Sequence, residues 1–145
     1  MVSFEGSTQT YLVRLDRGEE IIESLASFAR KKELGSGWIS GIGAVHSTEL
    51  GYFELETRTY HRRKVDQELE LTNLTGNITW SEGAPVIHAH ATLSGPDYTA
   101  LGGHLFAATI AVTGEFQIIA MPSEVQRSVD DVSGLKLISG GAPLE

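Results

Sequence analysis

Hydrophobic residues recur at helical spacing in one segment near the N-terminus. Five of them share the i, i+1, i+4, i+7 and i+8 positions of a single helix face: Ile21, Ile22, Leu25, Phe28 and Ala29. This pattern predicts an amphipathic helix over residues 17–34. Asp16 is the expected N-cap, with Glu19 three residues later as in a capping box. Gly35 is expected to end the helix in a left-handed conformation.

The remainder of the chain places short apolar runs between turn residues, at intervals of about ten residues. Such spacing is typical of a largely antiparallel β-sheet, and one main helix ahead of many strands indicates the α+β class. The predicted strands are Tyr11–Leu15, Trp38–Val45, Glu49–Leu55, Arg58–Leu71, Leu74–Trp80, Val86–Leu93, Leu105–Val112, Glu115–Ala120 and Leu135–Ile138.

Four glycines lie within or just before the second predicted strand. Gly35, Gly37, Gly41 and Gly43 suggest a dinucleotide-binding loop, but the third glycine counted from Gly41 would fall at His46. The cluster also follows a helix, whereas a phosphate loop precedes one. We therefore interpret these glycines as sites of close backbone packing or β-bulges in a twisted strand.

Length and composition favour a single globular domain. We expect one domain over residues 1–145, with a core at about 10–120 and a weakly patterned tail at 123–145. The 19 acidic and 11 basic residues give a net charge of −8, which opposes general binding to nucleic acid or anionic membranes. Cysteine is absent, so a metal site would need histidine, carboxylate or water. No transmembrane or secretory segment is evident, and a cytoplasmic location is expected.

Three of the five histidines have the spacing of a metal site. His88 and His90 lie two residues apart on a predicted strand, so both side chains would point to the same face. A hairpin at residues 95–97 would return His104 to this pair, and a bulge at Gly102–Gly103 is expected to re-aim its ring. Three imidazoles with an open coordination position suit Zn²⁺ or a similar divalent ion, although hydrogen bonding in a polar cleft would use the same residues.

Other chemistry has less support in the sequence. No nucleophile with a base partner is evident, so a catalytic role is not favoured and no catalytic residue is assigned. Glu68, Glu70 and Glu115 are interpreted as ordinary solvated strand positions, and His46 and His61 as surface or strand-end residues. The basic run over 61–64 is interpreted as a charged turn or a protected edge strand.

Taken in order, these features resemble the PPC domain family, also called DUF296, which plants and prokaryotes share. The resemblance covers roughly residues 10–120. Its most specific motifs are the Gly-Ile-Gly-Ala strand, the His-x-His pair and the Gly-Gly-His segment, at 41–44, 88–90 and 102–104.

The resemblance implies an α+β fold, a homotrimer, and metal bound at His88, His90 and His104. Plant members carry an AT-hook that binds AT-rich DNA, and prokaryotic members are often named DNA-binding by analogy. No such hook occurs in this chain, so DNA is not an expected partner. The function that we expect is a zinc-binding, homo-oligomeric module for a small-molecule ligand or protein partner. A DNA-associated regulator and a metal-dependent enzyme are the alternatives.

Self-association also has support from the strand composition. The segments 107–112 and 118–120 would place apolar side chains on both faces of the sheet, while one amphipathic helix can cover only part of one face. Symmetric association is the commonest way to bury such a surface. This argument predicts an oligomer, and the number three comes from the resemblance.

Overall fold

The computed structural model describes residues 2–5 and 9–140, and most of this part of the chain is β-strand. The α+β class is confirmed, although the helix is shorter and the sheet larger than expected. The elements are β1 Val2–Glu5, β2 Thr10–Asp16, α1 Ile21–Lys31, β3 Ser36–Glu54, β4 Thr59–Val65, β5 Leu69–Ser81, β6 Ala84–Ser94, β7 Ala100–Met121, β8 Gln126–Val129 and β9 Lys136–Ser139.

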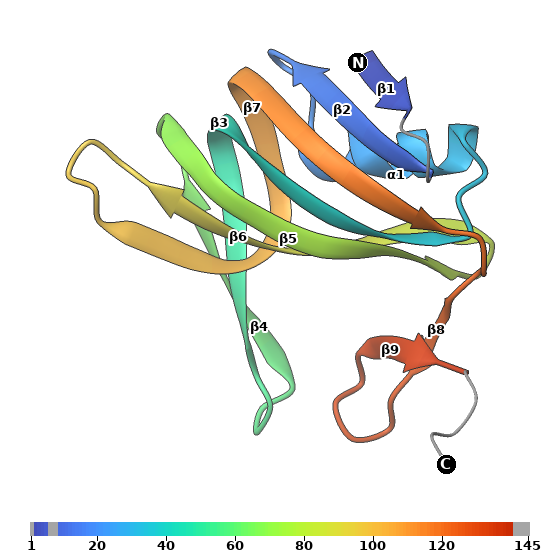
Figure 1. The fold of residues 1–145 in the computed structure, drawn as a ribbon. Coiled ribbons are helices and arrows are strands. Elements are labelled where there is room, and N and C mark those ends of the chain that lie inside the picture. The colour runs from blue at the N-terminus through green and yellow to red at the C-terminus, as the bar shows by residue number, and fades with distance from the viewer. Residues whose placement is uncertain (1, 6–8, 141–145) are drawn as a thin grey trace.

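The strands of the described residues form one sheet in which almost every pairing is antiparallel. Its main path runs β1-β2-β7-β3-β5-β8-β9, and β4 pairs with β3. Strand β6 pairs with both β5 and β7, so that β3, β5, β6 and β7 close into a ring. The β3–β4 and β8–β9 hairpins extend from the same side of the sheet (Figure 1).

Buried side chains lie on the sheet face that α1 covers. The helix contributes Ile21, Leu25 and Phe28 to the core and packs against β6 and β7. Phe28 meets the ring of Tyr11 edge-on, with 5.3 Å between the ring centroids. Burial alternates along β6: the odd-numbered residues from Ile87 to Leu93 are buried, while His88 and His90 point to the opposite, outer face.

The boundaries of α1 differ from the predicted 17–34. The helix begins at Ile21, and the carboxylate of Glu20 caps it by accepting a 2.7 Å bond from the Glu23 amide. Asp16 is therefore not the cap; its amide donates to the carboxylate of Glu19 in the preceding turn, at 2.7 Å.

The C-terminal end of α1 also differs from the prediction. Glu33, not Gly35, adopts the left-handed conformation with φ of 52°. The amide of Leu34 then donates to the Ala29 carbonyl and that of Glu33 to the Arg30 carbonyl, as in a Schellman motif. Gly35 has another role, because a Cβ there would lie 2.5 Å from the carbonyl oxygen of Pro122.

Several predicted strands prove to be parts of longer ones. The predicted strands 38–45 and 49–55 join in β3, those at 105–112 and 115–120 join in β7, and 58–71 divides between β4 and β5. The register shifts between Gly41 and Gly43, which confirms the expected bulge. A Cβ at Gly43 would lie 2.3 Å from the Thr113 carbonyl oxygen, so glycine lets β3 and β7 stay paired through the bend.

Residues 124–140 of the predicted tail contain more strand than their sequence pattern suggested, and residues 141–145 of it lie outside the described part of the chain. The predicted strand at 135–138 is observed as β9, and β8 was not predicted. The Trp80 amide bonds the Val125 carbonyl at 2.8 Å, and the Ser36 hydroxyl bonds the Ser123 carbonyl at 2.7 Å. These contacts fix the β8–β9 hairpin beside the outer face of the sheet. No helix in the described part of the chain is long and apolar enough to cross a membrane.

Candidate metal centre

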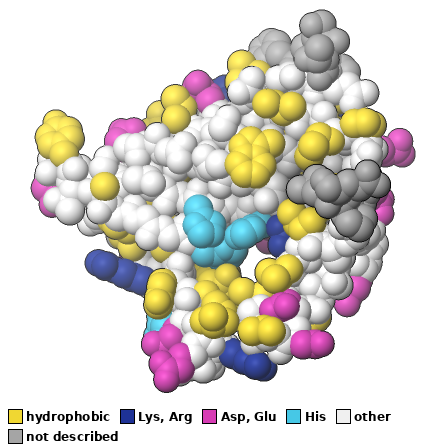
Figure 2. All heavy atoms as spheres, turned by 60° about the horizontal axis from the view of Figure 1, so that its bottom comes forward, with side chains coloured by type: hydrophobic (Ala, Val, Ile, Leu, Met, Phe, Trp, Pro, Cys, Tyr) yellow, Lys and Arg dark blue, Asp and Glu magenta, His cyan; other side chains and the backbone are white. Residues whose placement is uncertain are grey.

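The three predicted histidines converge on the outer face of the sheet. His88 and His90 project from β6, and His104 on β7 is the direct cross-strand partner of His90. Their ring centroids are 5.2 to 5.5 Å apart, and one nitrogen from each ring lies within 4.8 Å of the other two. Figure 2 shows histidine side chains gathered in a hollow of the surface. The expected hairpin return of His104 is therefore confirmed.

The expected bulge at Gly102–Gly103 is not present. The register between β6 and β7 runs from His90–His104 to Ser94–Ala100 without a shift. The glycine instead permits close approach of a third strand, because a Cβ at Gly103 would lie 2.8 Å from the carbonyl oxygen of Gly51. His104 consequently pairs with both β6 and β3, which fixes its backbone from two sides.

Burial favours the neutral forms of His88 and His104. Desolvation and the neighbouring histidines lower the pKa of His104 from its ordinary 6.5 to about 4. Desolvation, followed by Arg127 and His90, also lowers the pKa of His88. Neutral imidazoles offer unprotonated nitrogens, which metal ligation requires. The buried Nδ1 of His104 has no hydrogen-bond partner among the described residues, so this donor set fits a divalent ion.

Aromatic rings from the β3–β4 hairpin and β7 surround His104. Its ring centroid lies 5.3 Å from that of Tyr60 and 4.7 Å from that of Phe106. The guanidinium of Arg62 lies over the ring of Phe106, 3.7 Å from its centroid. These aromatic rings therefore pack against the ring of His104.

Arg127 is a site residue that the sequence interpretation missed. From β8 it donates to the Thr79 hydroxyl at 2.7 Å, and its NH2 group bonds the Asn77 side chain at 2.9 Å and His88 Nδ1 at 3.3 Å. The NH1 group bonds the Lys136 carbonyl at 2.7 Å. Residues 125–129 show no apolar–polar alternation in the sequence, and nothing local linked Arg127 to the histidines.

Two hollows adjoin the triad. The first, of about 220 Å³, lies between His88, His104, Arg127, Tyr60 and residues 135–137, where β9 begins. The second, of about 460 Å³, opens toward His90 beside Gly51–Phe53 and Gly102–Gly103. The described linings of both contain no aspartate or glutamate.

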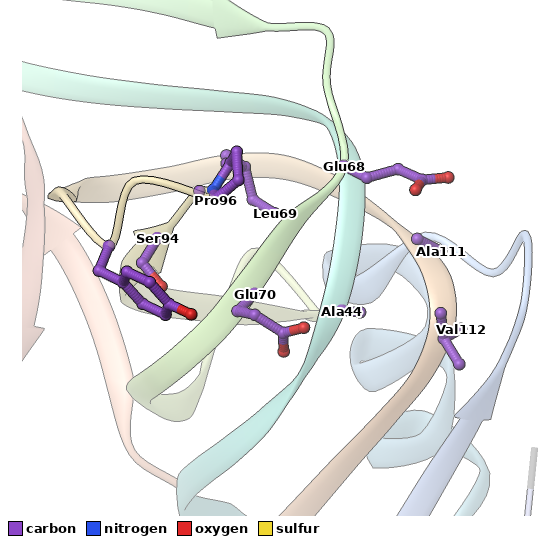
Figure 3. Close-up of a pocket in the computed structure, with 10 residues that line it drawn as sticks. Ala44, Glu68, Leu69, Glu70, Ser94, Pro96, Ala111 and Val112 are labelled. Atoms are coloured by element: carbon purple, nitrogen blue, oxygen red, sulfur yellow. The ribbon is translucent and has the colours of Figure 1, made fainter.

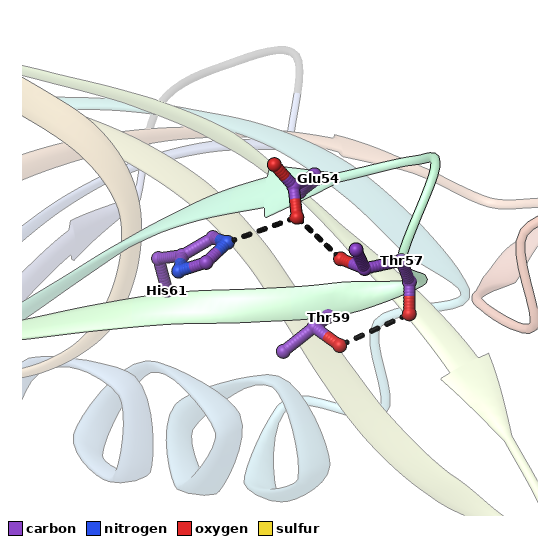
Figure 4. A network of polar contacts seen from close by, with 4 residues as sticks. All are labelled: Glu54, Thr57, Thr59 and His61. Atoms are coloured by element: carbon purple, nitrogen blue, oxygen red, sulfur yellow. Dashed lines mark hydrogen bonds and ion pairs between the residues drawn. The ribbon is translucent and has the colours of Figure 1, made fainter.

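The remaining histidines lie outside the triad, as predicted. His46 is half-buried and bonds the Ser47 hydroxyl at 3.0 Å. His61 is exposed on β4, where its ring lies 3.3 Å from the Glu54 carboxylate; Thr57 bonds the same carboxylate (Figure 4). The basic run that includes His61 lies on β4 at the edge of the sheet, as expected.

The candidate carboxylates do not gather into a site. Glu68, Glu70 and Glu115 are all exposed, in agreement with their interpretation as solvated positions. Glu68 and Glu70 line a separate hollow of about 440 Å³ together with Ser94 and Val112 (Figure 3). Within the described residues, the histidine triad is the one group with metal-ligand geometry.

The fold and the triad define a class of small α+β domains with a candidate histidine metal centre on the outer face of the sheet. The chain belongs to the Plants and Prokaryotes Conserved (PCC) domain family, whose model matches residues 2–123. The family resemblance noted in the sequence is thereby confirmed. No curated protein matches the chain.

Solved structures support the same assignment. A candidate DNA-binding protein from Bacteroides thetaiotaomicron is 30% identical, with a TM-score of 0.91 over 95% of this chain and 96% of that one. A metal-containing protein from Archaeoglobus fulgidus is also 30% identical, with a TM-score of 0.85 over 97% and 99%. A PPC protein from Pyrococcus horikoshii is 28% identical, with a TM-score of 0.85 over 98% and 97%.

Proposed function

We propose that His88, His90 and His104 bind one divalent ion, zinc, and that the domain serves as a metal-dependent module for binding a small ligand. The observation that carries this proposal is the convergence of three imidazoles, one of which has a buried and unpartnered Nδ1. The similar protein from Archaeoglobus fulgidus is described as metal-containing, which adds support. When bound, such an ion would supply a Lewis-acidic coordination position for the ligand.

The protein's own residues would orient and shield this position. The β6–β7 pairing holds His90 and His104 side by side, while Tyr60 and Phe106 pack against the ring of His104. The hollows beside the triad give a small molecule access to it. A metal-dependent enzyme is the alternative, and turnover of a substrate by the metal-loaded protein would favour it over the binding module.

Elemental analysis of untagged protein tests the metal site. Parent and His88→Ala are expressed identically, and His61→Ala serves as the matched control because His61 is exposed outside the triad. The parent and the control should each contain about one zinc per chain, and His88→Ala should contain little or none. Equal metal content in all three proteins would contradict the proposal.

We also propose that the domain is a homotrimer that buries part of the outer sheet face. Leu12, Trp38 and Ile119 are 51%, 49% and 48% exposed, and they lie on adjacent strands. Direct pairing places Ile119, Trp38, Asn77 and His88 in one row, so this apolar surface adjoins the metal site. A contiguous apolar patch on a sheet face is typical of an association surface.

A role on DNA is the other candidate function, favoured by the description of the Bacteroides thetaiotaomicron protein. The net charge of −8 opposes it, because a polyanion would meet a negatively charged surface. We place the proposed module in the cytoplasm, as expected from the sequence.

A further inference from the structure

We propose that the hollow between β6, β4 and β9 binds a small organic carboxylate, with its charged group at Arg127 and its apolar body against Tyr60, Val86 and Leu137. This inference deepens the proposed function and rests on it in one respect, since metal loading is expected to strengthen the binding. It names the chemical class of the ligand and the residues that select it.

The lining of this hollow combines an apolar wall with basic groups. Tyr60, Val86, Leu135 and Leu137 provide hydrophobic surface, and Arg127 and the histidines provide polar groups. In a chain with a net charge of −8, the absence of aspartate and glutamate from the described lining is notable. An anion entering here would therefore meet no carboxylate in this lining, and its hydrocarbon part would be removed from water.

Arg127 supplies a positive charge that no carboxylate neutralises within the described residues. Its hydrogen-bond partners are a hydroxyl, an amide, a backbone carbonyl and an imidazole, all uncharged acceptors. Three of these, Thr79, Asn77 and the Lys136 carbonyl, fix the guanidinium in place. Lys136 differs, because its ammonium group pairs with Glu82 at 3.0 Å. Arg127 is therefore the cation available to a ligand.

The bond between Arg127 and His88 links the carboxylate to the metal. Arginine can only donate, so His88 Nδ1 must be the unprotonated nitrogen that accepts. A neutral imidazole has one such nitrogen and cannot both accept from Arg127 and ligate an ion. Metal binding at His88 would thus free one N–H of Arg127, which a ligand carboxylate can accept.

The size and donor set of the hollow favour a carboxylate over a phosphate. Its volume of about 220 Å³ fits a small organic acid. Most N–H donors of the Arg127 guanidinium already make hydrogen bonds within the protein. Its remaining donors and its single positive charge match a monoanion. Phosphate sites usually supply several further donors, such as a helix N-terminus or a backbone nest.

Calorimetric titration of zinc-loaded full-length protein with benzoate tests the inference. Benzyl alcohol, which has the same ring without the charge, and inorganic phosphate are titrated in parallel. Benzoate should bind at least about tenfold more tightly than either compound, and removal of zinc should weaken it. Equal binding of benzoate and benzyl alcohol, or tighter binding of phosphate, would overturn the proposal.

Variants assign the binding to the named residues. Arg127→Gln should weaken benzoate about tenfold or more but keep its zinc, while Arg30→Gln, an exposed arginine at the end of α1, should bind both like the parent. Leu137→Asp adds a negative charge to the apolar wall and should also weaken benzoate. Val132→Asp is its control, because Val132 is exposed in the turn between β8 and β9 and does not line the hollow.

Zinc content is measured for every variant, so that failure of the metal site is separated from failure of the carboxylate site. A parent that takes up no zinc when the metal is supplied, yet binds benzoate through Arg127, would overturn the metal proposal and keep the carboxylate inference. Benzoate binding that is unchanged in both Arg127→Gln and Leu137→Asp would overturn the carboxylate inference whatever the zinc content.

Discussion

His90 and His104 are direct cross-strand partners on β6 and β7, although a loop separates them in the sequence. Their rings meet edge-on with 5.5 Å between centroids, and His88 completes the group from the same face of β6. Because both strands are fixed by further pairing, with β5 on one side and β3 on the other, the site belongs to the rigid part of the sheet. Such backbone support holds three ligands together before an ion arrives.

The first prediction concerns stabilisation by zinc. An ion that binds only the folded state should raise the free energy of unfolding by about 2.7 kcal/mol at a free concentration one hundred times its Kd. Thermal unfolding should show this increase for the parent and for the control His46→Ala. His90→Ala should lose this stabilisation by zinc, because only two of the three imidazole ligands remain. Equal stabilisation of His90→Ala would show that zinc binds elsewhere.

The second prediction concerns pH in the absence of metal. The folded pKa of His104, at about 4, lies below its ordinary 6.5, so the unfolded chain binds the additional proton between these values. Stability should therefore be complete above pH 6.5 and fall as the pH decreases toward 4. The groups responsible, after desolvation, are His88, His90, Arg62 and Arg127. Urea titrations of chelator-treated protein should show a smaller decrease for His104→Gln than for the parent.

The third prediction concerns the core. Phe116 is fully buried, and Gly41 leaves the room for its ring that a side chain would fill. Phe116→Ala should cost about 3–5 kcal/mol of unfolding free energy, because it removes a large apolar side chain and leaves a cavity. Gln117→Ala, at the next and exposed position of β7, should change stability by less than about 0.5 kcal/mol. Chemical denaturation measures the unfolding free energy of both variants and the parent, all at the same protomer concentration.

The fourth prediction concerns assembly. Light scattering at low micromolar concentration should give the mass of a trimer for the parent and a smaller mass for Trp38→Glu. The substitution would bury a charge in an apolar interface, which is unfavourable. The total surface area buried in this interface is expected to be on the order of 2,000 Å² or more if the oligomer is obligate. Tyr98→Glu is the control, since Tyr98 is 89% exposed in the β6–β7 loop, away from the outer row. A monomeric parent would contradict the assembly proposal, and a dimer would contradict only the number three.

The fifth prediction concerns nucleic acid. Specific DNA-binding proteins typically reach affinities of about 10⁻⁸ to 10⁻¹¹ M at physiological salt. With a net charge of −8 and one short basic run on β4, this chain should show no such affinity for AT-rich duplex DNA in fluorescence anisotropy. Nanomolar binding with a steep dependence on salt would contradict this expectation.

The sequence by itself determined the elements whose signals are local. The period of apolar residues fixed the presence of α1, and two histidines at strand spacing fixed a shared face for His88 and His90. Turn residues at 95–97 predicted the hairpin that returns His104. The helix ends were less predictable, because Glu20 and Glu33 take roles for which Asp16 and Gly35 are the better local candidates.

Only the tertiary structure decided which distant residues complete the site. The side chain of Arg127 reaches His88 because β8 pairs with β5 through Trp80 and Gln126, a contact between segments 46 positions apart. The long strand β3 likewise continues through a bulge where Gly43 allows close approach to Thr113. Hydrophobic periodicity indicates which face of an element is buried. It does not indicate which element packs against that face, because this depends on packing across the whole chain.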